Sequence, residues 1–167
     1  MFSRRTRVIV SLIAVVAVAV MIFMFSAQEG EKSSRVSGRV TKYLLNVFVR
    51  GFRDLPPTER AAYIARWGHV VRKVAHFSEY ALLAFTLAAF WHYLPGDRRL
   101  WHVALLAWLL ATAYAGTDEW HQIFVGGRAG MPMDVLIDSC GAATGALVGI
   151  LLIRLRAKVR AKREAQT

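Results

Sequence analysis

Nine ionisable or amide side chains stand in three stretches, at spacings that place the members of each stretch on one face of a helix. They are Arg72, Lys73, His76 and Glu79 in the first stretch, Asp118, Glu119 and Gln122 in the second, and Asp134 and Asp138 in the third. An imidazole and several carboxylates supply proton donors and acceptors for acid–base chemistry. Arg and Lys side chains bind phosphate and carboxylate groups. The residue types therefore point to catalysis on a charged ligand or to binding of one.

Four apolar segments must position these side chains. They occupy residues 8–25, 74–94, 100–116 and 132–153. Each is about as long as a helix must be to cross ~30 Å of hydrocarbon. The sequence therefore predicts an all-α, polytopic membrane protein with four transmembrane helices, which form a single membrane domain over residues 1–167.

Residues 34–72, between the first two apolar segments, have a different pattern. Val36, Val40, Leu44 and Val47 recur at helical spacing, and Lys and Arg take the other faces. This pattern is typical of an amphipathic helix that lies in the membrane interface. After the fourth apolar segment, residues 154–167 form a basic tail.

The formal net charge is +11, and the basic residues gather at the ends of apolar segments. That distribution suits anionic lipid headgroups. No nucleic-acid-binding motif is present, so membrane lipids rather than nucleic acids are the predicted partners. Lys and Arg are densest in the two tails, which predicts a cytoplasmic-membrane protein with both termini cytoplasmic. The single cysteine, Cys140, excludes an internal disulfide framework and a cysteine-based zinc site.

An up-and-down arrangement of the four spans brings the three polar stretches to one face of the bilayer. The stretches lie at the start of the second span, after the third and at the start of the fourth. A charged side chain within a membrane helix costs about 2.5–3.5 kcal/mol on insertion scales, so several of them require partners or water. We therefore predict one shared polar cavity, with His69 solvated outside it. Gly141, Gly145 and Gly149 continue the face of Asp134 and Asp138, and glycines four apart allow another helix backbone to approach closely.

These polar stretches resemble motifs of the VanZ-like family of bacterial membrane proteins. The resemblance rests on residues 73–80 (KVAHFSEY), 118–124 (DEWHQIF), Gly127-Arg128 and 134–138 (DVLID), with a shorter likeness at residues 25–28 (FSAQ). It implies an envelope membrane protein with this polar set as its functional centre. Because the family's namesake is associated with teicoplanin resistance, it also implies a link to antibiotic resistance. Asp138 stands where the family commonly has Asn.

The residues leave three functional readings open. In the first, Arg72, Lys73, Gln122, Arg128, Asp134 and Asp138 bind an envelope lipid, a lipid-linked or cell-wall precursor, or a glycopeptide drug. In the second, His76, Glu79, Asp118 and Glu119 are the catalytic groups of an enzyme that acts on a lipid-linked substrate by acid–base chemistry. In the third, the charges only form ion pairs between helices, such as Arg72 with Glu79 or Arg128 with Asp134.

The polar set gives no evidence for a cofactor of known type. His76 and Glu79, three residues apart, could contribute to an oxygen-rich metal site. Because the neighbouring Arg and Lys residues neutralise the same carboxylates, no metal is predicted. The cofactor and the oligomeric state stay open at this point.

Overall fold

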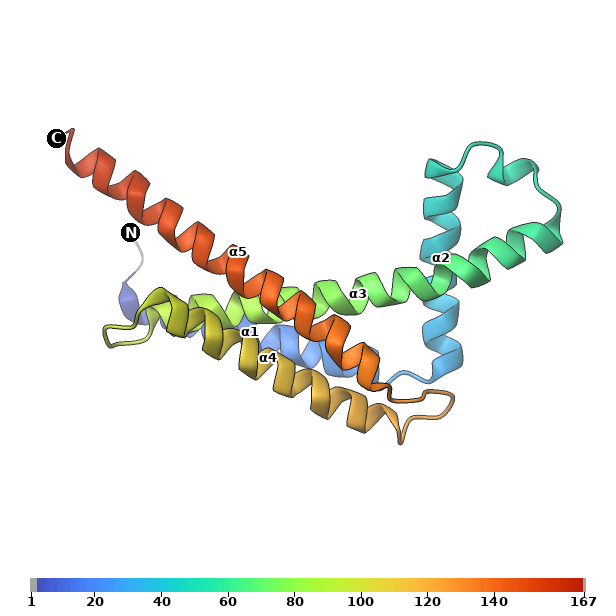
Figure 1. The fold of residues 1–167 in the computed structure, drawn as a ribbon, viewed down its shortest axis with the longest axis horizontal. Coiled ribbons are helices and arrows are strands. Elements are labelled where there is room, and N and C mark those ends of the chain that lie inside the picture. Colours follow the sequence, from blue (N-terminus) through green and yellow to red (C-terminus); the bar gives the residue numbers. More distant parts are fainter. Residues whose placement is uncertain (1–2, 167) are drawn as a thin grey trace.

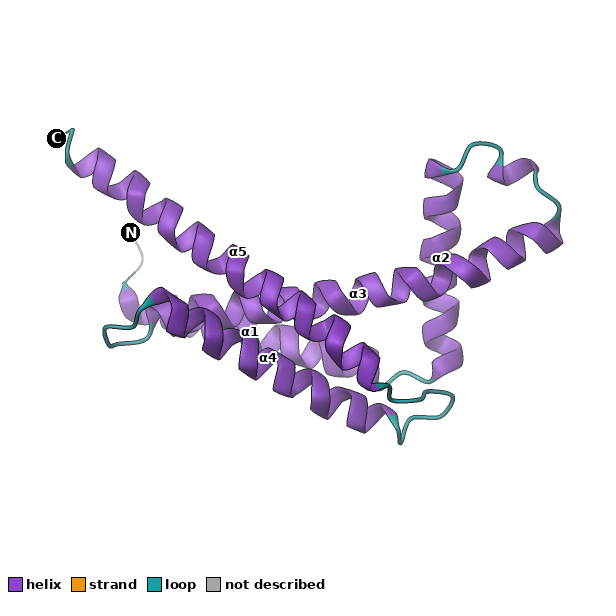
Figure 2. Ribbon diagram, in the orientation of Figure 1, coloured by secondary structure: helices purple, strands orange, loops and turns teal. Residues whose placement is uncertain are grey.

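The computed structural model describes residues 3–166, and all of the regular secondary structure in that range is helical (Figure 2). In chain order the elements are α1 (Arg4–Ser26), α2 (Gly30–Phe48), the short 3-10 helix η1 (Phe52–Asp54), α3 (Pro57–Tyr93), α4 (Leu100–Gln122) and α5 (Pro132–Glu164). The helices α1, α3, α4 and α5 are long and apolar enough to cross a membrane. The predicted fold class is therefore confirmed.

Helix α3 is the centre of the bundle and contacts α1, α2, α4 and α5. The start of α1, the end of α5 and the turn between α3 and α4 lie at one end of the molecule (Figure 1). The α1–α2 junction and the loop between α4 and α5 lie toward the opposite end. This up-and-down order brings the start of α5 and the end of α4 beside the middle of α3.

A stripe of small residues lets α5 pack closely against α3. A Cβ atom built on Gly141 would overlap the carbonyl oxygen of Phe77, and one built on Gly145 would overlap that of Ala81. A Cβ on Gly149 would lie 3.0 Å from the Cβ of Ala88. The predicted close approach along this glycine stripe is confirmed, and it holds together two of the three helices that carry the polar stretches.

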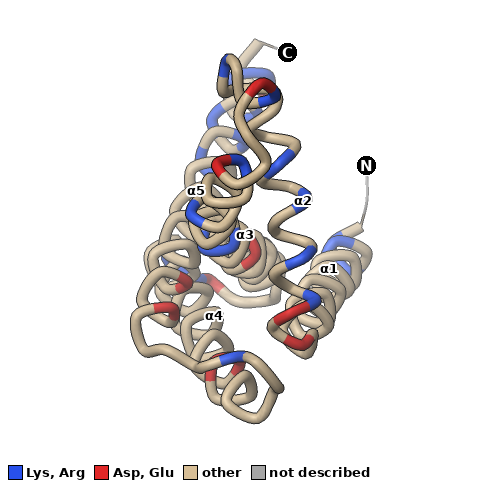
Figure 3. Tube along the Cα trace, turned by 90° about the vertical axis from the view of Figure 1, so that its right-hand side faces the viewer, with Lys and Arg blue, Asp and Glu red and all other residues tan. Residues whose placement is uncertain are grey.

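The segment predicted to be amphipathic forms α2, η1 and the first turns of α3. Helix α2 runs across α3 rather than along it (Figure 1), and Thr41 and Leu45 are its buried contacts. Val36, Val40 and Phe48 are exposed, and Lys and Arg recur along the helix (Figure 3). Helix α2 therefore presents both apolar and basic side chains outward, close to the end of the bundle that carries the polar stretches.

The helices extend beyond the apolar segments that predict them. Helix α3 begins at Pro57, so its first 17 residues precede the apolar segment. Pro57 occupies the first helical turn, where its missing N–H breaks no helical hydrogen bond. Helix α4 continues to Gln122 and therefore includes the second polar stretch, and the basic tail is helical to Glu164.

Candidate functional site

A polar cavity of about 120 Å³ lies between α3, the end of α4, the 123–131 loop and the start of α5. Its polar lining residues are His69, Arg72, Lys73, His76, Glu119, Gln122, Arg128, Asp134 and Asp138. Eight of the ten residues named as site candidates from the sequence thus lie around one cavity. The helices position them because each stretch keeps to one helical face, and because α5 is held close to α3.

The other two sequence candidates lie beside the cavity. Asp118 is buried, and one of its carboxylate oxygens accepts a hydrogen bond of 3.1 Å from Nε2 of Gln122. Glu79 lines a neighbouring groove. His69, which the sequence interpretation left solvated outside, is exposed but lines the cavity. His69 lies on the same face of the helix as Arg72 and His76, and this periodicity in the sequence indicates that it lines the cavity.

Asp138 is the most deeply buried of the cavity carboxylates, with a side chain that is 1% exposed. Neither of its oxygens has a hydrogen-bond partner among the described residues, and the same holds for Nδ1 of His76 and Nε of Arg72. Buried polar groups are normally paired, and an unpaired charge is far more costly than an unpaired amide. The cavity therefore contains three buried groups whose hydrogen-bonding capacity the protein does not satisfy.

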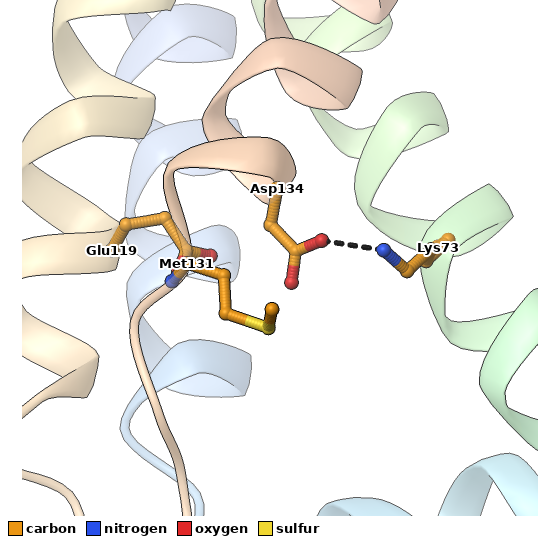
Figure 4. A network of polar contacts seen from close by, with 4 residues as sticks. All are labelled: Lys73, Glu119, Met131 and Asp134. Atoms are coloured by element: carbon orange, nitrogen blue, oxygen red, sulfur yellow. Dashed lines mark hydrogen bonds and ion pairs between the residues drawn. The ribbon is translucent and has the colours of Figure 1, made fainter.

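One ion pair crosses the cavity from α3 to α5. The Nζ atom of Lys73 lies 2.7 Å from Oδ1 of Asp134 (Figure 4), and both side chains are about 30% exposed. At this exposure the pair adds no more than about 1 kcal/mol to stability. It nevertheless neutralises Lys73, which is then not available to a ligand as an isolated cation.

Glu119 anchors the start of α5. Its Oε2 atom accepts a hydrogen bond of 2.9 Å from the backbone N–H of Met131, the residue that caps α5 (Figure 4). A carboxylate near a helix N-terminus is favourable because the first N–H groups are unpaired and carry partial positive charge. Gly130 allows this approach, because a Cβ there would overlap the carbonyl oxygen of Glu119.

Arg128 ties the 123–131 loop to the end of α1. Its Nε donates to the carbonyl oxygen of Gln28 at 2.9 Å, and its Nη2 donates to that of Phe25 at 3.1 Å. Its Nη1 donates to Oε1 of Gln122 at 3.2 Å. Burial, and then the charge of Arg72, lower the pKa of Arg128, but an arginine stays protonated in proteins. In this structure Arg128 binds backbone carbonyl groups at and just after the C-terminus of α1, where the last helical carbonyls lack intrahelical partners.

The ion pairs suggested from the sequence are wrong in detail. Asp134 pairs with Lys73 and not with Arg128, whose guanidinium binds backbone carbonyls instead. Arg72 donates to Oγ of Ser34 at 2.7 Å, and over residues 3–166 no ion pair joins it to Glu79. The reason is that α2 and the end of α1 supply oxygen acceptors within reach of both arginines.

Replacing Arg128 with Ala is expected to lower the free energy of unfolding by about 1–3 kcal/mol, because two charge-assisted hydrogen bonds, to the carbonyls of Phe25 and Gln28, are lost. Arg128→Lys should recover only part of this loss, since one ammonium group cannot reproduce the planar fork of donors. Unfolding by SDS titration of the purified protein measures the effect. Arg66→Ala, at an exposed arginine on α3, is the control. Equal stability of the Arg128→Ala and Arg66→Ala proteins would contradict this role.

The described residues contain no group of three or more His, Cys, Asp or Glu side chains that could hold a metal ion. The arrangement offers instead a carboxylate, an imidazole and a guanidinium that face a small polar volume. Such a set can bind a charged or hydroxylated group, and it can also donate and accept protons.

Comparison with known proteins identifies one protein family. The VanZ/LLP1 family matches residues 11–154, which include every residue that lines the polar cavity. Curated proteins and solved structures gave no significant match. Because the family match covers most of the sequence, the chain belongs to the VanZ/LLP1 family.

Proposed function

We propose that this VanZ/LLP1 protein binds the polar part of a cell-envelope ligand in the cavity between α3, α4 and α5. The ligand would be an envelope lipid or a lipid-linked cell-wall precursor. With both termini on the cytoplasmic side of the cytoplasmic membrane, the cavity would open at the outer face. The observation that carries the proposal is Asp138, a buried carboxylate without a hydrogen-bond partner among the described residues.

The energetics of binding depend on the polar atoms at the cavity that the protein itself leaves without a hydrogen-bond partner among the described residues. Burying a polar group without a partner costs about 1–3 kcal/mol on mutational scales, and a charge costs more. Asp138, His76 and Arg72 each leave at least one such buried atom at the same cavity. A ligand with both donors and acceptors would hydrogen-bond with all three groups, in place of the water that a polar cavity of this size can hold.

The size of the cavity limits what it can enclose. Sites for drug-sized molecules usually have volumes of about 300–1,000 Å³, whereas this cavity has about 120 Å³. It would accommodate a headgroup or the end of a precursor rather than a whole glycopeptide antibiotic. A contribution to teicoplanin resistance, which family membership implies, would therefore act through a lipid or a cell-wall precursor.

Glu119→Gln tests the proposal because it removes the charge of a lining residue. The amide oxygen of Gln can still accept the hydrogen bond from the Met131 N–H. Two quantities are measured: the amount of protein in the membrane and the binding of lipids and precursor. Binding is measured by native mass spectrometry of the full chain, released from nanodiscs that contain bacterial phospholipids and a lipid-linked cell-wall precursor. We expect normal accumulation and at least about a tenfold loss of binding, equivalent to ~1.4 kcal/mol. Glu59→Gln, at an exposed carboxylate on α3, should behave as wild type.

Two outcomes would contradict the proposal. If Glu119→Gln binds as wild type does, the cavity is not the binding site. If Glu119→Gln fails to accumulate while Glu59→Gln accumulates, the charge serves folding, as expected for a purely structural cluster.

An acid–base enzyme is the second candidate, and one observation favours it. Nδ1 of His76 and the carboxyl group of Asp138 both lack a hydrogen-bond partner among the described residues and line the same cavity, so a proton acceptor and a proton donor could face one substrate. Incubation of the purified protein with labelled envelope lipids distinguishes the two. Appearance of a changed lipid that Glu119→Gln does not produce would establish turnover, and binding without conversion would leave a binding protein.

A further inference from the structure

A second hollow adjoins the polar cavity and has the opposite character. It has a volume of about 190 Å³ and lies between the end of α1, α2 and α3. Its apolar lining includes Phe25, Val36, Val40, Val71 and Ala75. We call it the α2–α3 groove.

The α2–α3 groove and the polar cavity share lining residues. Arg72, His76 and Arg128 line both. A single molecule could therefore place a polar end in the cavity and an apolar portion in the groove. The groove exists because α2 crosses α3 with only part of its apolar face in contact (Figure 1), so Val36 and Val40 stay exposed.

The free groups in the cavity have two signs. Lys73 is paired with Asp134, and three donor positions of Arg128 bind carbonyl and amide oxygens. Among the described residues, this leaves three buried groups at the cavity without a partner: the cationic donor Nε of Arg72, Nδ1 of His76 and the carboxyl group of Asp138. A headgroup with an anionic oxygen and a positively charged donor would make charge-assisted hydrogen bonds with both Arg72 and Asp138.

The charge balance favours a ligand that carries a cation. Counted by formal charge, five carboxyl groups lie around the cavity and the adjoining groove, against three Lys and Arg side chains. They are Glu79, Asp118, Glu119, Asp134 and Asp138 against Arg72, Lys73 and Arg128. An ammonium group would reduce the excess of negative charge, whereas a purely anionic headgroup would increase it.

We infer that the ligand is a membrane amphiphile with a zwitterionic headgroup, in which a phosphate faces Arg72, an ammonium faces Asp138 and an alkyl chain lies in the α2–α3 groove. This inference rests on the proposed function and specifies the ligand class of that site. Phosphate with guanidinium and ammonium with carboxylate are the charge-assisted hydrogen bonds that these groups make best. The groove therefore fixes the orientation of the ligand, with the headgroup in the polar cavity and the alkyl chain pointing toward α2.

The test measures binding of three probes to the detergent-solubilised full chain by microscale thermophoresis. The probes are dioleoylphosphatidylethanolamine, dioleoylphosphatidylglycerol and the chain-free headgroup glycerophosphoethanolamine. Ala75→Trp fills the groove from α3, and Val40→Trp fills it from α2. Ala65→Trp, at an exposed alanine on α3 outside the cavity and the groove, is the matched control.

We expect wild type to bind the phosphatidylethanolamine probe at least about tenfold more tightly than the phosphatidylglycerol probe. Each groove variant should lower the phosphatidylethanolamine affinity at least about tenfold, because the Trp side chain excludes methylenes of the alkyl chain from the groove. Binding of glycerophosphoethanolamine should stay unchanged in both groove variants. The Ala65→Trp protein should match wild type with all three probes.

Other outcomes separate this inference from the proposed function. Equal affinities for the two lipids, or wild-type lipid affinity in both groove variants, would overturn the zwitterionic amphiphile. The proposed function would survive that result if Glu119→Gln still lowered binding of the lipid-linked precursor at least about tenfold. If neither these probes nor the precursor bound wild type, the proposed function and this inference would both fail.

Discussion

Gly145→Ala is expected to destabilise the bundle by at least about 3 kcal/mol and to reduce its accumulation in the membrane severely. The added Cβ would overlap the carbonyl oxygen of Ala81 in α3. A backbone carbonyl cannot move aside as a flexible side chain can, so α3 and α5 must separate, and the fit of their small residues is lost. The measurement is SDS-induced unfolding together with the amount of protein in the membrane.

Gly116→Ala is the matched control for this change, because it makes the same substitution within α4 where no atom lies within 4 Å of the added Cβ. Helix propensity alone should make that variant neutral or up to about 1 kcal/mol more stable. Equal behaviour of Gly145→Ala and Gly116→Ala would show that the close contact between α3 and α5 is not a feature of the folded protein.

Asp138→Asn is expected to stabilise the unliganded protein by about 1–3 kcal/mol and to weaken ligand binding by at least about 100-fold. The stability gain arises because an amide is less costly to bury than an unpaired carboxylate. The loss of binding arises because one partner of a buried charge pair with the ligand disappears, which costs about 2–5 kcal/mol in comparable interfaces. Opposite changes in stability and binding are characteristic of functional sites.

The measurements for Asp138→Asn are SDS unfolding without ligand and native mass spectrometry with the phosphatidylethanolamine probe. Asp97→Asn, at an exposed aspartate in the turn between α3 and α4, should change neither. A loss of stability in Asp138→Asn would show that the carboxylate holds the bundle together and would favour the purely structural reading. A stability gain with unchanged binding would show that Asp138 does not contact the ligand.

The sequence predicts which side chains meet, because helical periodicity and the order of the spans are sufficient for that. Periodicity places Asp134 and Asp138 on one face of a helix, and an up-and-down order places that face beside His76 and Glu119. The glycine stripe predicts that the contact is close. These inferences can be made without knowing the distances between the helices or the rotamers of the side chains.

The partners of individual long side chains could not be predicted in the same way. Arg128 has several acceptors within its reach, and its choice of the Phe25 and Gln28 carbonyls depends on where α1 ends in space. The path of α2 across α3 was equally inaccessible, because an amphipathic pattern gives the apolar face of a helix but not its crossing angle. The α2–α3 groove follows from that angle, so it emerges only from the structure.

An experimental structure of wild type in lipid nanodiscs tests the central claim most directly. The decisive feature is the content of the cavity beside Asp138. We expect density for a bound molecule whose polar end lies within hydrogen-bond distance of the Asp138 carboxylate and whose remainder extends toward α2. A cavity that is closed by protein side chains hydrogen-bonded to Asp138, or that holds water alone, would contradict the account.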